Sequence, residues 1–359
     1  MKVLCVGGGT LGSVTPLLAV VEQLKLRQPS IRVEWWGTET GPERELIEAQ
    51  GISFKVISGG KLRRYLSLEN FFDLARILSG FMESLWRFGQ SKPDCLLTAG
   101  SYVAVPVGWA AYFYGVPVFI HQQDVRLGLA NRLLKPVAKV ITVALSESVK
   151  DFPGGKVVVT GNPVRSVFEQ VPDKETARKK LGLDPARATI LIIGGGTGAQ
   201  AINELVANIK QGLVNIAQVI HLTGPNKKYE EVDLPGYLAI SSTNESVTVL
   251  VAADLVITRA GMGVLTELSA LSKPAVVVPI PDSHQQDNAD YFAKRGGVIL
   301  IPQEELTPGR LLATVSELLG DNEQRNNLGK QLKQLLPPGA AGRVADLVTA
   351  EIYKNHEQI

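Results

Sequence analysis

Two glycine-rich runs, each directly after a short apolar run, constrain the fold of this chain more than any other feature. Gly7-Gly8-Gly9-Thr10 follows the apolar run Lys2–Val6, and Gly194-Gly195-Gly196-Thr197 follows Thr189–Ile193. A helical pattern begins after each glycine run. Strand, glycine turn and helix in this order form the opening unit of a Rossmann-like α/β domain. Because the unit recurs about half a chain later, we predict two similar α/β halves.

The remaining apolar runs continue the same alternation. Short β-branched strands separated by helical patterns indicate parallel sheets covered by helices on both faces. Further strands are expected at 33–36, 95–98, 116–120, 140–143, 219–222, 255–258, 275–279 and 298–301, and helices at 16–25, 43–50, 70–87 and 341–353. The first domain is expected at residues 1–163, with a C-terminal helix at about 341–359 packing back on it, and the second at 164–340.

Composition excludes several classes of protein. The net charge of +2 is too balanced for a nucleic-acid binder that works by bulk positive charge. Only two cysteines, Cys5 and Cys95, occur in 359 residues, so a disulfide-stapled fold is excluded. Residues 96–120 carry no charged side chain and are long enough to cross a bilayer. Prolines and glycines divide that stretch, so we expect a loop, a helix from about Pro106, a turn at Gly115 and a strand.

The glycine runs are suited to phosphate groups. A turn without Cβ atoms lets a phosphate approach the backbone N–H groups at a helix N-terminus. Neither run contains the GxxxxGK[ST] pattern of a Walker-type nucleotide site. Gly7, Gly9 and Gly12 satisfy GxGxxG, although no acidic residue stands at the usual distance after them. Each run alone is consistent with a tight turn, whereas two together favour a cleft for two phosphorylated ligands or one diphosphate.

A third glycine cluster and a polar run lie in the second half. Arg259-Ala260-Gly261-Met262-Gly263 follows the expected strand at 255–258 and opens a helix that contains Glu267. Glu267 either stabilises the helix dipole or accepts two ribose hydroxyls. The run from Pro279 to Asn288 is rich in amides and suits sugar hydroxyls, or it is a solvated loop.

Taken together, these clusters resemble the MurG family of peptidoglycan glycosyltransferases along essentially the whole chain. Gly161-Asn162-Pro163-Val164-Arg165 reproduces the family's GNPVR motif intact. The other matched segments are 8–16 for GGTGGHxxP, 100–106 for GGYVSxP, 121–132 for HEQNxxxGxxNK, 194–199 for GGSQGA, 259–267 for RSGAxTxxE and 284–289 for HQxxNA. Seven motifs in the order in which the family has them argue strongly against a chance match.

The resemblance implies a GT-B fold, with two Rossmann-like domains whose parallel sheets face each other across a cleft. It implies an inverting hexosyltransferase that moves GlcNAc from UDP-GlcNAc to the muramoyl 4-hydroxyl of lipid I and makes lipid II. The expected setting is peptidoglycan and cell wall biosynthesis, with cell shape and cell division depending on it, at the cytoplasmic face of the bacterial membrane as a peripheral protein. No cofactor, metal or nucleic acid is expected, and the sequence has no Asp-x-Asp and no metal-spaced His cluster.

Residue roles follow from the matched positions. Glu267 would accept the ribose hydroxyls, and the helix N-terminus and second glycine run would hold the donor phosphates. The expected donor-binding residues are Asn162, Arg165, Gly195, Gly196, Thr197, Gly261, Met262, Gly263, Glu267, Gln285, Gln286 and Asn288. The residues expected against the acceptor diphosphate are Gly9, Thr10, Gly12, Ser13 and Tyr102.

Several departures from the family pattern fall in the acceptor-side half. Ser13 stands where the family has His, Gln122 and Asp124 stand where it has Glu and Asn, and Ser101 stands where it has Gly. On the donor side, Gly196 replaces a serine. An inverting transfer needs a proton acceptor for the sugar hydroxyl, and a serine is not one near neutral pH.

Asp124 and His121 are the remaining candidates for the general base in the matched loop. Both residues are equally consistent with a role in holding the loop together. We expect Asp124 to carry the proton transfer, with His121 as the second candidate and Ser13 at the position of the family's loop histidine.

The expected helix at 70–87 has a composition typical of an interfacial helix, because aromatic and aliphatic residues alternate with arginines. The expected membrane contacts are Phe71, Phe72, Phe81 and Trp86. The alternative is an ordinary helix with one face on the core.

Two other functions remain open from the sequence. The first keeps the fold and the nucleotide-sugar donor but uses a different lipid-linked or glycan acceptor, as the departures in the acceptor-side loops suggest. The second is a UDP-sugar-binding protein of low catalytic activity. Retention of Glu267, Gln285 and the GNPVR motif argues against the second.

Overall fold

The computed structural model describes residues 1–60, 68–152, 154, 157–195, 198–225, 233–243 and 245–357, without the side chains of 68–72 and 355–357. The chain forms two compact units. Unit 1 comprises Met1–Arg165 and Gly339–Ile359, and unit 2 comprises Ser166–Pro338. The sequence-based boundaries lie at residues 163 and 340.

Unit 1 is built on a seven-stranded parallel sheet of order β3-β2-β1-β4-β5-β6-β7. Its strands are β1 (Lys2–Val6), β2 (Arg32–Gly37), β3 (Ser53–Val56), β4 (Cys95–Thr98), β5 (Val118–Gln122), β6 (Ala138–Val143) and β7 (Val157–Val159). Its helices are α1 (Thr15–Arg27), α2 (Glu43–Glu48), α3 (Leu68–Gln90), α4 (Ala104–Phe113), α5 (Leu129–Leu134) and α13 (Ala340–Glu357).

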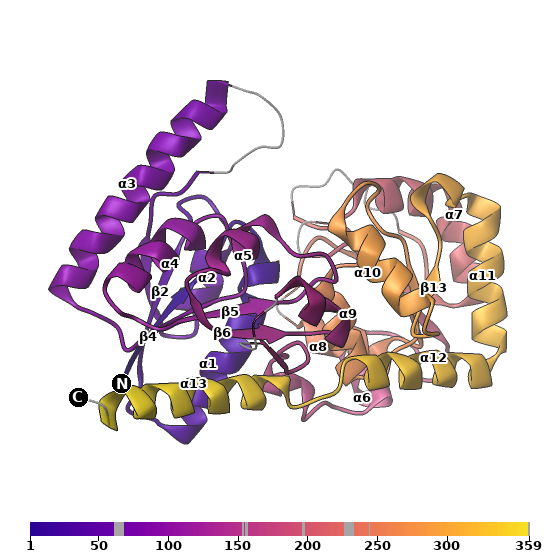
Figure 1. Ribbon diagram of the computed structural model, residues 1–359. Helices are drawn as coiled ribbons and strands as arrows, with labels where there is room; N and C mark the ends of the chain where they lie inside the picture. Colours follow the sequence, from indigo (N-terminus) through magenta and orange to yellow (C-terminus); the bar gives the residue numbers. More distant parts are fainter. Residues whose placement is uncertain are drawn as a thin grey trace. The chain divides into compact units, whose positions relative to one another are not determined.

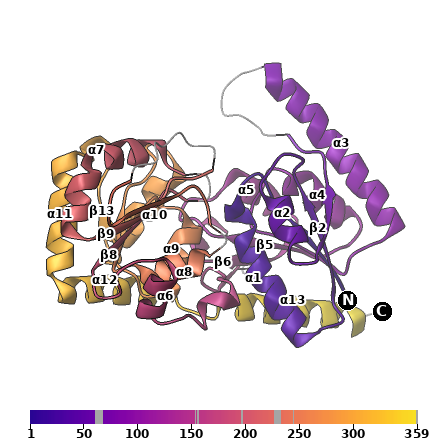
Figure 2. The ribbon, with the colours of Figure 1, turned by 180° about the vertical axis from the view of Figure 1, so that it is seen from behind.

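The residues of β1 alternate between two buried clusters. Val3 and Cys5 pack with α1 and α13 on one face of the sheet, whereas Leu4 and Val6 pack with α4 and the end of α3 on the other. A central strand buried on both faces is the reason why its sequence is a continuous apolar run. The chain's last helix, α13, packs across α1 (Figures 1 and 2).

Unit 2 repeats the design with a six-stranded parallel sheet of order β10-β9-β8-β11-β12-β13. The strands are β8 (Thr189–Ile193), β9 (Gln218–Leu222), β10 (Tyr237–Ile240), β11 (Leu255–Thr258), β12 (Ala275–Val277) and β13 (Ile299–Leu300). The helices are α6 (Lys174–Lys180), α7 (Gln200–Ile216), α8 (Ser246–Ala252), α9 (Met262–Ala270), α10 (His284–Ala293), α11 (Pro308–Gly320) and α12 (Asn322–Leu335). The two sheets confirm the predicted α/β class with two Rossmann-like domains.

Helix starts in unit 2 follow from local side-chain chemistry. Asp173, Ser283, Thr307 and Asp321 each accept a hydrogen bond from a backbone N–H in the first turn of α6, α10, α11 and α12. Such caps satisfy N–H groups that have no partner inside the helix. The polar run from Pro279 therefore continues into a helix from His284, which corrects the solvated-loop alternative for its second half.

The uncharged stretch from Leu96 to Ile120 is divided as predicted. It holds the end of β4, the ten-residue helix α4, a turn at Gly115 with φ of +63° and the start of β5. Among the described residues, no helix has both the length and the apolar character needed to cross a membrane. The strands at 53–56, 157–159 and 237–240 were not predicted, because each is short and half-exposed.

The packing of α13 on unit 1 leads to a prediction about the stability of the protein. Ile352 lies in α13, is 2% exposed and belongs to the cluster around α1, whereas the adjacent Tyr353 is 54% exposed. Ile352→Ala is expected to cost about 2–4 kcal/mol of unfolding free energy, because it leaves a cavity in the core. Tyr353→Ala is the matched control, with a change of about 0.5 kcal/mol or less. Equal urea midpoints for the two variants would contradict the packing described.

Candidate functional site

The first glycine run lies between β1 and α1 in unit 1. Gly9 has a φ of +81°, which favours glycine, and the backbone N–H of Gly9 donates to Glu43 Oε2 at 3.1 Å. The Tyr102 ring packs against it, since a Cβ on Gly9 would lie 3.1 Å from Tyr102 Cε1. Burial and, secondarily, the Glu43 charge raise the pKa of the Tyr102 hydroxyl. The Gly9 N–H, expected against the acceptor diphosphate, is thus already committed inside the protein.

The other residues expected on the acceptor side divide into exposed and buried ones. Thr10 and Gly12 are exposed, so their backbone groups are accessible to a ligand. Ser13 is 7% exposed, and its hydroxyl donates to the carbonyl oxygen of Thr10 at 3.4 Å. The Ser13 side chain therefore stabilises the loop from inside the protein and is not presented to a ligand.

His121, at the end of β5, is enclosed. Its Nδ1 lies 2.8 Å from Thr142 Oγ1 and its Nε2 lies 2.8 Å from Asn162 Oδ1, with 4% of the residue exposed. Burial lowers the pKa of the imidazole to about 4, although the Asn162 hydrogen bond opposes the shift. Because both ring nitrogens have internal partners, the structure disfavours His121 as the general base that the sequence left open.

The contact with His121 bears on the donor-binding roles expected of Asn162 and Arg165. Asn162 is 3% exposed and lies in unit 1, where its side chain holds His121. Arg165 Nε pairs with Glu22 Oε1 at 2.9 Å, with both side chains partly exposed. Asn162 is therefore not placed to bind a donor through its side chain as we had expected, because that side chain is buried beside β5 and β6.

A buried network of amides, not foreseen from the sequence, holds the loop that contains Asp124. Gln122 Nε2 donates to the carbonyl oxygens of Asp124 and Arg126 at 2.8 and 3.0 Å, and Asn131 Nδ2 donates to Gln122 Oε1 at 2.8 Å. Gln123 Nε2 donates to the Gly12 carbonyl at 2.8 Å. This last bond joins the Asp124 loop to the first glycine loop. Asp124 itself is half-buried, whereas Gln122 and Gln123 before it are buried.

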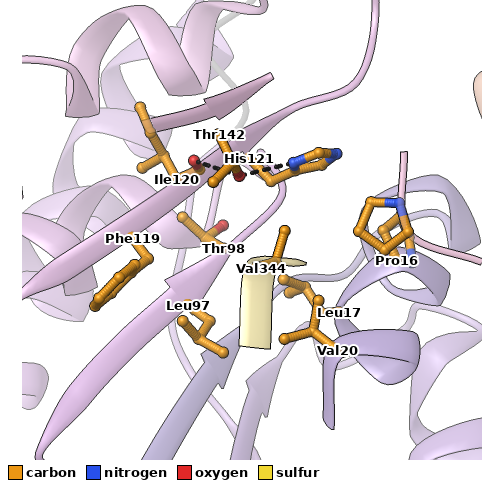
Figure 3. Close-up of a pocket in the computed structure, with 11 residues that line it drawn as sticks. Pro16, Leu17, Val20, Leu97, Thr98, Phe119, Ile120, His121, Thr142 and Val344 are labelled. Carbon is orange, nitrogen blue, oxygen red and sulfur yellow. Dashed lines mark hydrogen bonds between the residues drawn. The ribbon is translucent and has the colours of Figure 1, made fainter. Parts of the chain in front are cut away.

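A small cavity lies behind His121 and Thr142 (Figure 3). Pro16, Leu17 and Val20 of α1 and Val344 of α13 supply much of its wall. The remaining lining residues are Leu97, Thr98, Phe119, Ile120, His121, Thr142 and Pro163. A wall that is mostly apolar does not suit a sugar or a phosphate.

In unit 2, the second glycine run is shaped by close backbone contacts. Gly195 and Gly198 have φ values of +84° and +74°. A Cβ on Gly194 would lie 2.2 Å from the Ala199 nitrogen, and one on Gly198 would lie 2.3 Å from the Thr223 carbonyl oxygen. Only glycine fits at these two positions. Gly196 and Thr197, both expected against the donor phosphates, lie outside the described residues.

The N-terminus of α9 is open to a ligand. Gly261 is the N-cap residue, and a Cβ built on it meets no atom within 4 Å. Gly263 and Glu267 are partly exposed, whereas the Met262 side chain is 3% exposed and points into the core. Met262 can therefore offer a ligand its backbone N–H but not its side chain.

Asn288 supports this turn from behind. It is fully buried, and its Nδ2 donates to the Ala260 carbonyl at 3.1 Å. The Arg259 guanidinium likewise donates through Nη1 to the carbonyls of Val278 and Pro279, at 3.0 Å each. The expectation that Asn288 holds a GlcNAc hydroxyl is corrected, because its side chain does not reach the surface.

Gln285 and Gln286, at the start of α10, are partly exposed. Gln285 Oε1 accepts a hydrogen bond from the Ile280 backbone N–H at 3.3 Å, and Gln286 Nε2 donates to Asp290 Oδ1 at 3.2 Å. Each amide keeps further donor or acceptor capacity for a polar ligand.

Unit 2 contains a second enclosed histidine that sequence reasoning missed. His221 Nδ1 lies 2.6 Å from the Tyr237 hydroxyl, and Nε2 lies 3.0 Å from Asn203 Oδ1. Asn203 Nδ2 donates to the Thr223 carbonyl at 2.8 Å, directly beside Gly198. Burial lowers the pKa of His221 to about 4. A lone histidine in a strand carries no sequence signal that separates this role from an ordinary core position.

In the described part of the chain, no group of three or more His, Cys, Asp or Glu side chains is placed to hold a metal ion.

Comparison with known proteins covers nearly the whole chain. The model of the glycosyltransferase family 28 N-terminal domain matches residues 3–143, and that of the C-terminal domain matches residues 189–340. A protein of Clostridium kluyveri is 35% identical over 98% of this chain and 99% of its own length. A protein of Bacillus pumilus is 32% identical over 97% and 98%. Both carry the name UDP-N-acetylglucosamine–N-acetylmuramyl-(pentapeptide) pyrophosphoryl-undecaprenol N-acetylglucosamine transferase.

Among solved structures, that of Acinetobacter baumannii MurG superposes with a TM-score of 0.73 at 28% identity, covering 97% of this chain and 99% of that one. The glycosyltransferase of kitacinnamycin gives a TM-score of 0.72 at 16% identity, over 98% and 99% of the two chains, and this likeness shows a shared fold only.

The two enclosed histidines predict acid sensitivity. Each has a folded-state pKa near 4 against about 6.5 when unfolded, so the unfolded chain binds more protons between these values. Stability is therefore lost as the pH falls from about 6.5 towards 4, by about 3 kcal/mol per histidine at the limit. His221→Gln should flatten the decline of the urea midpoint over this range, whereas His284→Gln, at an exposed position, should leave it unchanged. Parallel declines for all three proteins would contradict this assignment.

Proposed function

The chain belongs to glycosyltransferase family 28 and to the MurG family within it, and we propose that it transfers GlcNAc from UDP-GlcNAc to the muramoyl 4-hydroxyl of lipid I, giving lipid II. The observation that carries this proposal is identity of 32–35% over essentially the full length of relatives named for that reaction. Both glycine turns and the open N-terminus of α9 support it, because they provide backbone N–H groups for phosphates.

The donor is assigned to unit 2. The backbone N–H groups of Gly195 and of the first turn of α9 are assigned to the diphosphate of UDP. Gly196 and Thr197 keep their expected role there, although they lie outside the described residues. Glu267, one turn into α9, accepts the ribose hydroxyls. Gln285 and Gln286 hold the hydroxyls of GlcNAc. The partial exposure of Gly263, Glu267 and both glutamines supports these roles.

The proton transfer is assigned to Asp124. The sugar 4-hydroxyl oxygen attacks C1 of GlcNAc, the bond from C1 to the UDP oxygen breaks with its electron pair going to UDP, and the hydroxyl proton passes to the Asp124 carboxylate. The anomeric configuration is inverted because attack and departure are on opposite faces. Partial exposure and the amide network around Asp124 support this role over the enclosed His121.

The direct test of the function is incubation of the protein with UDP-GlcNAc and a short-chain lipid I analogue. Mass spectrometry is expected to show the disaccharide product and release of UDP. A thermal shift with UDP-GlcNAc but no product from this acceptor would favour a different acceptor. Absence of UDP release with any lipid-linked or glycan acceptor would favour the binding protein.

Asp124→Asn is expected to lower kcat by about 100-fold to 10,000-fold, the usual contribution of a general base. The KM for UDP-GlcNAc should change by less than about twofold, because the donor is bound in unit 2. Glu317→Gln, an exposed carboxylate in α11, is the control for loss of one negative charge. Wild-type turnover by a folded Asp124→Asn protein would remove Asp124 from the mechanism.

We further propose that no metal takes part, because backbone N–H groups and the α9 N-terminus are sufficient partners for the UDP phosphates. Excess EDTA should leave turnover within about 20% of the untreated value, a margin that allows for ionic-strength effects on charged substrates. Loss of activity in EDTA that Mg²⁺ or Mn²⁺ restores would overturn this proposal.

Peripheral membrane binding on the cytoplasmic face is assigned to α3. Leu74, Leu78, Met82 and Trp86 recur at every fourth residue of this helix and are 58–67% exposed. Tyr112 and Phe113, at the end of α4, are also exposed and apolar, while Arg76 of α3 is ion-paired with Asp73 Oδ1 at 3.2 Å. An exposed apolar face of this kind suits the interfacial region of a lipid bilayer. In Figure 1, α3 forms the outer edge of unit 1.

The expected membrane contacts are only partly retained. Trp86 is 67% exposed, in agreement with such a role. Phe81 packs against the core cluster beneath α4 and makes an edge contact with Phe113 at 5.9 Å between ring centroids, so it is not a free contact residue. The side chains of Phe71 and Phe72 lie outside the described residues.

Replacing Leu78 and Trp86 by serine is expected to lower binding to vesicles of phosphatidylglycerol by about 100-fold or more, because about 1.5–3 kcal/mol is lost for each large apolar side chain withdrawn from lipid. Leu26→Ser, at a 70% exposed leucine in α1, is the matched control. Vesicle sedimentation that is equal for the double variant, the control and the wild-type protein would contradict the assignment.

A further inference from the structure

Glu43 is a fully buried carboxylate beneath the first glycine loop, and neither the motifs nor the proposed mechanism uses it. It lies in the first turn of α2 and is 0% exposed. Its Oε1 accepts hydrogen bonds from the Thr38 backbone N–H at 2.7 Å and from the Thr38 hydroxyl. Its Oε2 accepts the Gly9 N–H at 3.1 Å. A buried carboxylate is costly unless its oxygens are paired in this way.

The loop is shaped around this carboxylate. A Cβ on Gly8 would lie 2.1 Å from Glu43 Oε1, and one on Gly41 would lie 1.9 Å from Oε2. Both distances are far below contact distance, so glycine at these two positions makes room for the Glu43 side chain. Gly8 and Gly41 are thus glycines because a buried carboxylate lies against them.

The peptide group between Gly8 and Gly9 is held at both of its ends. Its N–H donates to Glu43, and its carbonyl oxygen, that of Gly8, accepts the Ser101 hydroxyl at 3.0 Å. Since N–H and C=O point in opposite directions across a trans peptide, these two bonds fix the rotation of the peptide plane. Tyr102 adds a third restraint, because its ring packs on Gly9 and its hydroxyl bonds the Thr38 side chain.

We propose that Glu43 is a positioning residue for the acceptor: it fixes the Gly8–Gly9 peptide so that the exposed backbone from Thr10 to Gly12 receives the diphosphate of the lipid-linked sugar. The proposal rests on the proposed function. Glu43 touches no substrate and acts through the loop alone.

The test is a comparison of KM values for the two substrates in Glu43→Gln. Glutamine offers one acceptor oxygen, so its NH₂ group faces either the Gly9 N–H or the Thr38 N–H, and that N–H loses its acceptor. We expect the segment that carries the unpaired N–H, the Gly8–Gly9 peptide or the Thr38 turn against which the loop packs, to shift. The KM for the lipid I analogue is expected to rise about tenfold or more, while the KM for UDP-GlcNAc changes less than about twofold, in keeping with loss of a hydrogen bond to a charged group. Glu43→Asp, which keeps both oxygens, should recover part of the acceptor KM, and Glu45→Gln, at an exposed position in α2, should resemble the wild-type protein.

Ser101→Ala keeps the proposal testable if Glu43→Gln does not fold. It removes only the hydroxyl at the other end of the same peptide, so the KM for the acceptor should rise about threefold with the donor KM unchanged. Unchanged acceptor KM values in Ser101→Ala and in any folded Glu43 variant, or equal rises for both substrates, would overturn the proposal. Absence of disaccharide from the wild-type protein would instead overturn the proposed function, so the two failures are distinguishable.

Discussion

Backbone approaches backbone closely at the ends of β1 and β8, and this contact sets where the first helix of each unit begins. A Cβ on Gly7 would lie 2.9 Å from the Ser13 carbonyl oxygen, and a Cβ on Gly194 would lie 2.2 Å from the Ala199 nitrogen. Glycine at these positions lets α1 and α7 begin directly above the strands that precede them. Each sheet then presents a helix N-terminus at the carboxyl edge of its strands, where ligands of open α/β folds bind.

In both units, a buried and uncharged histidine holds neighbouring segments together at this edge of the sheet. His121 and His221 stand near the ends of β5 and β9, and each has an asparagine on Nε2 and a hydroxyl on Nδ1. An imidazole that donates at one nitrogen and accepts at the other orders two neighbouring segments at once, provided that it stays uncharged. In unit 1 this arrangement fixes Asn162, and in unit 2 it fixes Asn203 and the carbonyl of Thr223 next to Gly198.

Much of the fold was predictable from the sequence because central parallel strands are buried on both faces. The strands at Lys2–Val6, Thr189–Ile193 and Leu255–Thr258 coincide with the apolar runs, residue for residue. The edge strand Ser53–Val56 was missed because its half-exposed residues dilute that signal. The site was predictable as a set of segments, whereas the direction of each side chain was not. Asn288 and Asn162 fall within motifs that suggest ligand binding, yet both side chains point inward, and only tertiary packing decides this.

An inverting GlcNAc transferase that acts on a muramoyl 4-hydroxyl is identified by the linkage in its product. Proton NMR of the disaccharide released from a reaction of the wild-type protein with UDP-GlcNAc and a lipid I analogue reports both the bond position and the anomeric configuration. We expect a β-linked GlcNAc on the 4-hydroxyl. An α-linkage, attachment at another hydroxyl or the absence of any disaccharide would contradict it.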